Sequence, residues 1–281
     1  MNSTTDSTAK SEQQLSKRIE DLLVARNPRG MKDVQPALEP GYYLRAAKLV
    51  REAIVEPDAS VLIGTGFPVV DTFETDGPVG AIALYNALES LGAKPVIVCG
   101  APLSAALAEQ YRVQEILVGP HGEREQEARS ALEELKPQLI ISIERPGMAA
   151  DGCYYNMRGE DISPRAACFD TFMQLADCPT IAIGDGGNEI GMGNIAEALQ
   201  GLDIVPATTT CSELVIADVS NWAAHGLIAL LAKWNDKDLL AAVNISEILR
   251  YLSRRGSVDG VTRQNTLTED SLPVSEGEKI I

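Results

Sequence analysis

The chain has 281 residues, 45 % of them hydrophobic, which is enough for one large or two small domains with a sizeable core. Its 24 Lys and Arg against 40 Asp and Glu give a net charge of −16, so neither nucleic acid nor an anionic membrane is expected as a partner, since both require clustered basic residues. No apolar run reaches the roughly 18–20 residues of a transmembrane helix, and the polar start has no signal-peptide core, so we expect a soluble cytoplasmic protein.

The predicted elements begin with a polar N-terminal tail and helix over residues 1–40, in which Leu15, Ile19 and Leu23 recur at helical spacing. A single α/β domain is predicted over residues 41–265, followed by a polar C-terminal tail over 266–281. We expect helices at 41–54, 78–91, 101–111, 123–135, 164–176, 193–199, 221–234 and 245–254. We expect strands at 61–64, 95–99, 115–118, 138–143, 180–183 and 213–217.

The predicted strands are short apolar runs without alternation, separated by helices. This pattern is typical of parallel strands that are buried on both faces. The predicted fold class is therefore α/β, a doubly wound, mainly parallel sheet with helices on both faces. Ligands of such sheets lie beyond the carboxyl ends of the strands, which here lead into loops at 64–76, 144–161 and 184–193.

Two of these loops resemble the start of a dinucleotide-binding motif but depart from it. Val69 in one loop and Glu189 in the other stand where the third glycine of the motif is required. The acidic side chain of Glu189 would also repel a pyrophosphate. Nucleophilic triads are also not favoured, because His121 and His225 are the only histidines and His225 lies on an apolar helical face typical of a core histidine. Five cysteines without a C-x-x-C pair do not indicate a zinc site.

All three loops, at 64–76, 144–161 and 184–193, contain carboxylates. Carboxylates that converge at one edge of a sheet repel one another, and either a shared proton or a hard divalent cation relieves the repulsion. A site made of oxygen donors favours Mg²⁺, Mn²⁺ or Ca²⁺ over zinc. Taken singly, Asp76 is equally well explained as a helix cap, Asp185 as a turn residue and Glu74 as a solvated charge. As a set, the candidate metal ligands are Glu74, Asp76, Glu144, Asp151, Asp185 and Glu189.

The 144–161 loop also carries groups suited to a small carboxylate ligand. Arg145 and Arg158 offer guanidinium groups, and Tyr155 and Asn156 offer hydrogen-bonding side chains. The alternative is that Arg145 pairs with a neighbouring acid and that the tyrosines pack the loop against the body. Further along the chain, a helix is expected to begin near Ser220, with Trp222 in the core.

Together these motifs resemble the D-glutamate cyclase family, over residues 31–273. The resemblance rests on Glu74-Thr75-Asp76-Gly77-Pro78, Glu144-Arg145-Pro146-Gly147, Asp151-Gly152, Tyr155-Asn156-Met157-Arg158-Gly159, Gly184-Asp185-Gly186-Gly187-Asn188-Glu189-Ile190-Gly191-Met192-Gly193, Ser220-Asn221-Trp222 and Asp259-Gly260-Val261-Thr262. The chain departs from the family at Ala223-Ala224-His225, where Gly and an aromatic residue are more frequent.

The resemblance implies that D-glutamate, an acidic amino acid, is converted to 5-oxo-D-proline with loss of water. In that reaction Glu189 would take a proton from the amine and Glu144 would give one to the leaving oxygen, with Asp185 as the third catalytic carboxylate. A divalent cation would polarise the γ-carboxylate that is attacked. The predicted substrate-binding residues are Arg145, Tyr155, Asn156, Arg158 and Asn188.

Two other functions remain open from the sequence. One is a metal- or small-ligand-binding module without cyclase turnover, and the other is a metal-dependent hydrolase of phosphorylated substrates, which we expect to need more Lys and Arg. A homo-oligomer is compatible with either. Residues 166–232 hold eight acidic and no basic residues, which indicates a cation-collecting rim, and Arg145 and Arg158 are the basic residues expected near it.

Overall fold

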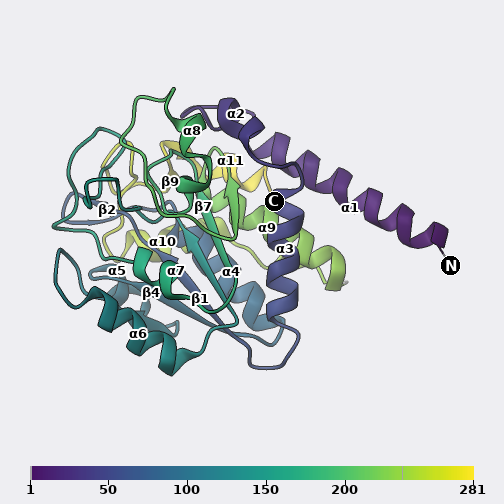
Figure 1. Ribbon diagram of the computed structural model, residues 1–281, viewed down its shortest axis with the longest axis horizontal. Coiled ribbons are helices and arrows are strands. Elements are labelled where there is room, and N and C mark those ends of the chain that lie inside the picture. Colours follow the sequence, from purple (N-terminus) through teal and green to yellow (C-terminus); the bar gives the residue numbers. More distant parts are fainter. Residues whose placement is uncertain (1, 236) are drawn as a thin grey trace.

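The computed structural model describes residues 2–235 and 237–281, with side chains from residue 9 onward; residue 1 of the predicted tail lies outside this part. Six strands form one sheet in the order β5-β4-β1-β6-β7-β8, and every neighbouring pair is parallel (Figure 1). This confirms the predicted fold class. The strands are β1 (Ser60–Thr65), β4 (Lys94–Cys99), β5 (Val113–Glu115), β6 (Leu139–Ile143), β7 (Thr180–Gly184) and β8 (Glu213–Ile216).

The inner strands are largely apolar because they are covered on both faces. All five positions of β6 and of β7 are buried, and Ile63 of β1 is paired with Ile141 of β6. The chain runs from β1 outward to β4 and β5, and then crosses back to place β6 on the other side of β1. The strand order therefore reverses between β1 and β6, and the crevice at such a reversal is where open α/β sheets bind ligands.

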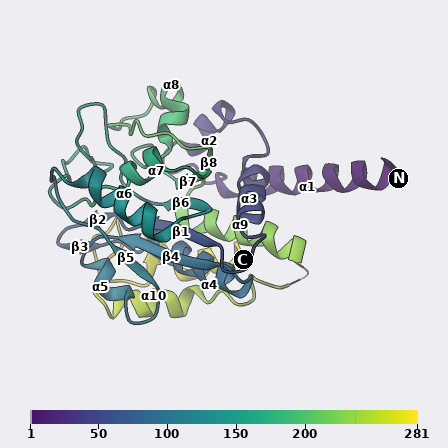
Figure 2. The same ribbon diagram turned by 60° about the horizontal axis from the view of Figure 1, so that its bottom comes forward.

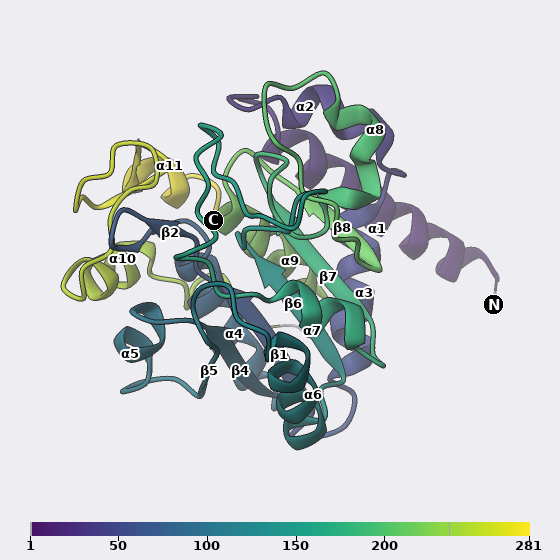
Figure 3. The same ribbon diagram turned by 60° about the vertical axis from the view of Figure 1, so that its left-hand side comes forward.

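Helices cover both faces of the sheet, as Figures 2 and 3 show from two directions. One face is covered by α6 and α7, which contribute Ala128, Ala131 and Phe172 to the core. The other face is covered by α3, α4 and α9, and Gly80 allows α4 to approach the backbone of α9 closely. The helices are α3 (Tyr42–Ala53), α4 (Pro78–Ser90), α5 (Leu103–Leu107), α6 (Arg124–Leu135), α7 (Asp170–Leu175), α8 (Ala196–Leu199, after the 3₁₀ turn η2, Met192–Ile195), α9 (Ser220–Asn235) and α10 (Ile245–Ser253).

The helix expected at 164–176 is wrong over its first half, because α7 begins only at Asp170. The preceding residues hold their backbone groups in tertiary contacts instead. The carbonyl of Ala166 accepts from Gly119 N at 2.8 Å, and the carbonyl of Ala167 accepts from the guanidinium of Arg145. Residue 167 also forms an antiparallel bridge with Val118. Helix propensity depends on the local sequence alone, so it does not detect such long-range partners.

The N-terminal segment, expected as a tail and helix, packs onto the body. Helix α1 (Asn2–Leu23) projects from the molecule at its start, and its second half lies beside α3 (Figure 1). Ser16 and Glu20 are buried there and accept hydrogen bonds from Leu44 N (3.0 Å) and Gly41 N (2.9 Å), so they cap α3 from another helix. Short turns α2 (Met31–Val34) and η1 (Gln35–Ala37) follow. In the described residues no helix combines the length and apolar character needed to cross a bilayer.

The C-terminal segment expected as a polar tail is also ordered. Strands β9 (Thr268–Glu269) and β10 (Leu272–Pro273) form a small antiparallel hairpin, and α11 (Val274–Glu278) follows. Glu269 is buried, and its carboxylate accepts a hydrogen bond of 2.8 Å from the side chain of Asn221 in α9. The sequence predicts a polar tail here because the partners of these polar groups lie far away in the chain. A second hairpin, β2 (Pro68–Val69) and β3 (Thr72–Phe73), follows β1.

His225 of α9 is a core residue, as expected, but neither ring nitrogen has a hydrogen-bond partner among the described residues. Burial lowers the pKa of its imidazole to about 4. Above pH 6.5 the imidazole is neutral in the folded and the unfolded chain alike. Between pH 6.5 and 4 only the unfolded chain binds the proton, so the free energy of unfolding falls as the pH falls, by about 3 kcal/mol in total.

We therefore expect His225→Leu to unfold with a shallower pH dependence between pH 6.5 and 4 than the parent protein, measured by urea titration at each pH. His121→Leu is the matched control, because it removes the other imidazole of the chain from a loop and should retain the parental acid sensitivity. An unchanged pH profile in His225→Leu would show that this histidine is not what destabilises the protein in acid.

Candidate active site

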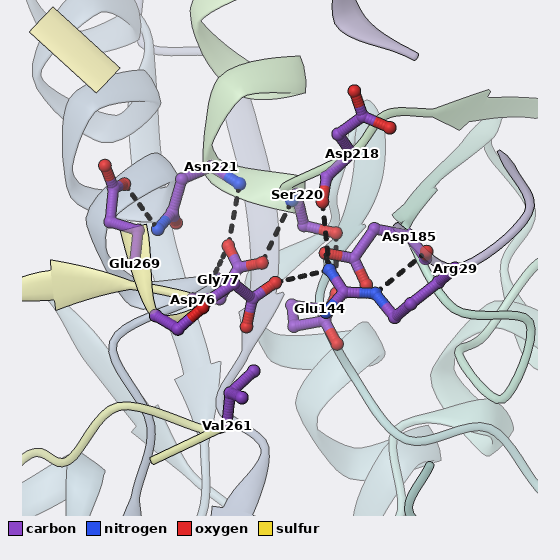
Figure 4. Close-up of polar contacts among 12 residues, drawn as sticks. Arg29, Asp76, Gly77, Glu144, Asp185, Asp218, Ser220, Asn221, Val261 and Glu269 are labelled. Atoms are coloured by element: carbon purple, nitrogen blue, oxygen red, sulfur yellow. Dashed lines mark hydrogen bonds and ion pairs between the residues drawn. The ribbon is translucent and has the colours of Figure 1, made fainter. Parts of the chain in front are cut away.

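Three carboxylates from separate strands meet where the strand order reverses. Asp76 follows β1 and its hairpin, Glu144 directly follows β6, and Asp185 directly follows β7. All three are buried, and one oxygen of each lies within 4.8 Å of the others (Figure 4). The convergence expected for acids at the carboxyl ends of parallel strands is therefore present in the fold.

Asp76 is tied to the start of α9. Its Oδ1 accepts from Asn221 N (2.8 Å) and Gly77 N (2.8 Å), and its Oδ2 accepts from Ser220 N (3.0 Å). Asp76 thus caps α9 across the molecule and makes no side-chain cap of α4, the helix that follows it. Burial raises the pKa of this carboxyl to about 7, and the neighbouring charge of Asp270 adds to the rise.

Glu144 is held in an unusual backbone conformation. Its φ is +46°, in the left-handed region that costs a non-glycine residue about 1 kcal/mol. Gly77, at φ +88°, permits this placement, because a Cβ there would lie 2.7 Å from Cβ of Glu144. Oε2 of Glu144 accepts the Ser220 hydroxyl at 2.6 Å. Burial, and then the charge of Glu189, raise the pKa of Glu144 well above its usual range, which favours its protonated form.

Arg29 supplies the positive charge of the cluster. Its guanidinium is ion-paired with the carboxylates of Asp185 and Asp270, and it also donates to the backbone carbonyl of Asp218 at 2.9 Å (Figure 4). Burial works against the charged form, but Asp185, Asp270 and Glu144 raise the pKa of Arg29 well above its usual value. The repulsion between the acids is thus relieved in part by a guanidinium, whereas the sequence predicts a shared proton or a divalent cation. Arg29 lies in the segment expected as a tail.

Glu74 and Glu189 are two further buried acids near the cluster. Glu74 is buried against Gly260, where a Cβ would lie 1.7 Å from its Oε2, and burial followed by the charge of Asp270 raises its pKa well above the usual range. Glu189 folds back over its own turn, where Oε2 accepts Gly187 N at 2.7 Å and Oε1 has no partner among the described residues. Burial raises its pKa as well.

A cavity of about 570 Å³ opens beside these acids. Glu74, Glu144 and Asp185 line it, whereas Glu189 does not. Other lining residues bring charge and hydrogen-bonding groups from distant segments: Arg26, Arg29, Asn156, Arg158, Glu160, Arg165, Asn188, Asp218, Arg263 and Asp270. The cavity therefore presents both carboxylates and guanidinium groups to a ligand, an arrangement suited to a small molecule with charges of both signs.

Three of the predicted substrate-binding residues line this cavity. Arg158 is exposed and donates to the carbonyl of Val261 at 2.9 Å. Asn156 holds the 156–160 turn together, and Asn188 donates to the carbonyl of Tyr155 at 2.9 Å while its buried Oδ1 has no partner among the described residues. These groups remain candidates for binding a carboxylate.

Asp151 and Tyr155 lie apart from the cluster. Asp151 is exposed, where it accepts the Tyr155 hydroxyl at 2.6 Å and Cys153 N at 3.0 Å, and neither residue lines the cavity. This local pairing lowers the pKa of the Asp151 carboxyl, opposite to the rise found within the cluster. Of the six predicted metal-ligand candidates, the structure brings oxygen atoms of Asp76, Glu144 and Asp185 within 4.8 Å of one another. Glu74 and Glu189 are buried near them, and Asp151 lies outside.

Arg145 also turns away from the cluster. Its guanidinium donates to the carbonyls of Thr65 (2.9 Å), Gly66 (3.3 Å) and Ala167, and among the described residues it forms no ion pair with Glu144 or with any other acid. It lines a second, smaller cavity. The alternative reading, that Arg145 pairs with a neighbouring acid, is not what the structure shows, because backbone carbonyls at the end of β1 and at Ala167 accept from its guanidinium instead.

Comparison with known proteins agrees with the motifs. The family model described as "D-glutamate cyclase-like, C-terminal" matches residues 19–281. The human protein "D-glutamate cyclase, mitochondrial" is 34 % identical over 199 residues, which are 61 % of this chain and 32 % of that protein. The chain therefore spans about a third of the length of this relative.

Likeness to solved structures is weak. A quinone oxidoreductase from Pseudomonas syringae is 14 % identical, with a TM-score of 0.30 over 72 % of this chain and 53 % of that one. A score at this level carries no argument about function. The family match, in contrast, includes every residue of the carboxylate cluster and Arg29. The chain belongs to the D-glutamate cyclase-like, C-terminal family.

Proposed function

We propose that this chain is a D-glutamate cyclase-like lyase that converts D-glutamate to 5-oxo-D-proline and water in the 570 Å³ cavity. The observation that carries the proposal is Glu144, a carboxyl with a raised pKa that faces this cavity and is hydrogen-bonded to Ser220. The human relative's name supports the reaction class. Because the chain spans about a third of that relative, the activity of this part alone is itself proposed.

Recognition of the substrate follows from its three charges. D-glutamate carries one ammonium and two carboxylates, and both acids and arginines line the cavity. Arg158, with the amides of Asn156 and Asn188, is placed to bind the α-carboxylate. Arg145, expected from the sequence to share this role, lies in the other cavity and is not assigned to it.

Cyclisation forms the bond from the amine nitrogen to the γ-carboxyl carbon and breaks one carbon–oxygen bond there. The ammonium loses two protons and the leaving oxygen gains two, so no net proton is taken up. Protonated Glu144 gives one proton to the leaving oxygen and is reprotonated by the second proton that the nitrogen loses once the new bond has formed. Burial raises the pKa of Asp185 well above its usual value, and Arg29 opposes that rise. Asp185, which lines the cavity, takes the first proton from the ammonium and passes it to the leaving oxygen as water departs. Glu189 acts through Glu144, whose protonated form its charge favours.

A divalent cation fits the donor set. Asp76, Glu144 and Asp185 offer oxygen atoms only, within 4.8 Å of one another, which suits Mg²⁺, Mn²⁺ or Ca²⁺. When bound, the cation would neutralise and polarise the substrate's γ-carboxylate. Arg29 already binds Asp185, so the guanidinium and the cation would compete for that carboxylate.

The proposal is tested by incubating the purified chain with D- or L-glutamate and quantifying 5-oxoproline. We expect product from D-glutamate, slower turnover of the L isomer by about tenfold or more, and loss of turnover in EDTA with recovery on adding Mn²⁺ or Mg²⁺. Turnover that EDTA leaves unchanged would remove the cation from the reaction.

A second candidate is a binding module for a metal ion or small ligand that performs no cyclisation. The observation that favours it is that the match covers only 32 % of the human relative, whose name describes the activity of that whole protein. Calorimetric binding of Mn²⁺ or D-glutamate without any 5-oxoproline would decide for the module. Product formation by the purified chain would decide for the lyase.

A further inference from the structure

We infer that the smaller cavity, built around Arg145, is a second ligand site that binds a small organic carboxylate. It has a volume of about 250 Å³ and lies at the carboxyl ends of β1 and β4, lined by the turns Thr65–Pro68 and Gly100–Leu103. This inference does not depend on the proposed cyclase reaction.

Arg145 is a buried cation that forms no ion pair among the described residues; the charge of Asp170 acts on it, but that carboxylate accepts its hydrogen bonds from other groups, Tyr154 among them. Its side chain is among the largest that are fully buried, at 2 % exposure. The guanidinium donates only to backbone carbonyls, lies 5.6 Å from the centre of the Phe169 ring, and leaves Nε without a partner among the described residues. An uncompensated buried charge costs several kcal/mol, so the site is built to receive a negative group.

The walls of the cavity indicate what kind of anion fits. Phe73, Leu103 and Val118 make much of the lining apolar, and the buried hydroxyl of Thr65 has no hydrogen-bond partner among the described residues. The acid in the lining, Asp71, is exposed on the β2–β3 turn. A carboxylate with a short apolar chain matches this combination, since its head meets Arg145 and its chain the apolar wall. A phosphate would carry more charge toward Asp71 and leave the apolar wall uncovered.

The β2–β3 hairpin separates this site from the candidate active site. Phe67, Pro68 and Val70 of the hairpin region, with Arg165, line both cavities. Glu144 and Asp185 line the larger cavity and not the smaller one. A ligand in the smaller cavity therefore shares a wall with the larger one but contacts none of the clustered carboxylates.

The test is titration of the purified full chain with butyrate, and separately with phosphate, at constant ionic strength, followed by calorimetry and thermal unfolding. We expect butyrate to bind and to raise the melting temperature, and phosphate to bind at least about tenfold more weakly. Val118→Trp fills the cavity from a side chain that is 41 % exposed, so the fold should tolerate it, and butyrate binding should be lost. Arg145→Gln should weaken binding by about tenfold or more, and Glu144→Gln should leave it unchanged.

The inference is overturned if the parent protein shows no butyrate binding at millimolar concentration, or if Val118→Trp binds as the parent does. Binding lost in Glu144→Gln but kept in Val118→Trp would place the anion in the larger cavity instead. Phosphate binding tighter than butyrate would overturn the class of ligand. A failed cyclase assay affects none of these outcomes.

Discussion

Glu144→Gln is expected to slow 5-oxoproline formation by about 10²–10⁴-fold, since it removes the proton that Glu144 delivers to the leaving oxygen. Glutamine retains the size of the side chain and an oxygen that can accept the Ser220 hydroxyl, so the loop geometry should persist. The substitution also takes an ionisable group out of a cluster in which burial and neighbouring acids already favour its neutral form. The melting temperature should therefore remain at or above that of the parent.

Asp151→Asn is the informative control for this variant. The sequence places Asp151 among the metal-ligand candidates, whereas in the structure it is exposed and pairs with Tyr155 outside the cavity. We expect its turnover to remain within about twofold of the parent. Full activity in Glu144→Gln, with loss of activity in Asp151→Asn, would show that the site is not the buried cluster.

The backbone of this site could be predicted because its signals are local. The strands that carry Glu144 and Asp185 are runs of apolar residues with no alternation, which identifies parallel strands buried on both faces. Parallel strands place their following loops at one edge, so the meeting of acids from different loops follows from topology. Positions within the loops could not be predicted: Asp151 is exposed and hydrogen-bonded to Tyr155, away from that edge.

The counter-charge of the site could not be predicted in this way. Arg29 follows the first long helix and Asp270 lies in a hairpin near the other end, so no spacing in the sequence relates them to Asp185. One indirect signal was present: residues 166–232 carry eight acidic and no basic residues, and such a segment needs cations from elsewhere. That requirement shows that a partner exists without identifying it. The two ends of the chain are predicted as tails for the same reason, because the partners of their polar groups are distant in the sequence.

Arg145 is predicted to bind substrate because of its neighbours in the sequence, but it lines the other cavity. It is adjacent to Glu144, yet the chain turns at the φ of +46° and the two side chains enter different cavities. Successive side chains of an extended chain point to opposite faces, so two adjacent residues at a strand end commonly enter different sites. Sequence proximity to a catalytic candidate is therefore weak support for a shared site.

Arg29→Gln is expected to be the most destabilising substitution in the site, lowering the free energy of unfolding by about 3–5 kcal/mol at pH 7. The guanidinium side chain is only 16 % exposed, and its removal leaves Asp185 and Asp270 facing each other and the remaining acids without a cation. Urea titration with and without Mn²⁺ measures the effect. Added Mn²⁺ should recover part of the loss, because the vacated position then favours a divalent cation in the same oxygen-rich cluster.

Arg26→Gln is the matched control, from the same segment but with a side chain 44 % exposed and paired with Glu276 at the surface. We expect it to cost less than about 1 kcal/mol. Equal losses in the two variants would mean that Arg29 only anchors the N-terminal segment, as any surface pair would. A large loss in Arg29→Gln that Mn²⁺ does not reduce would show that the cluster needs a guanidinium specifically. Recovery by Mn²⁺ would instead establish that two cations, one from the chain and one from solution, stabilise the same carboxylates.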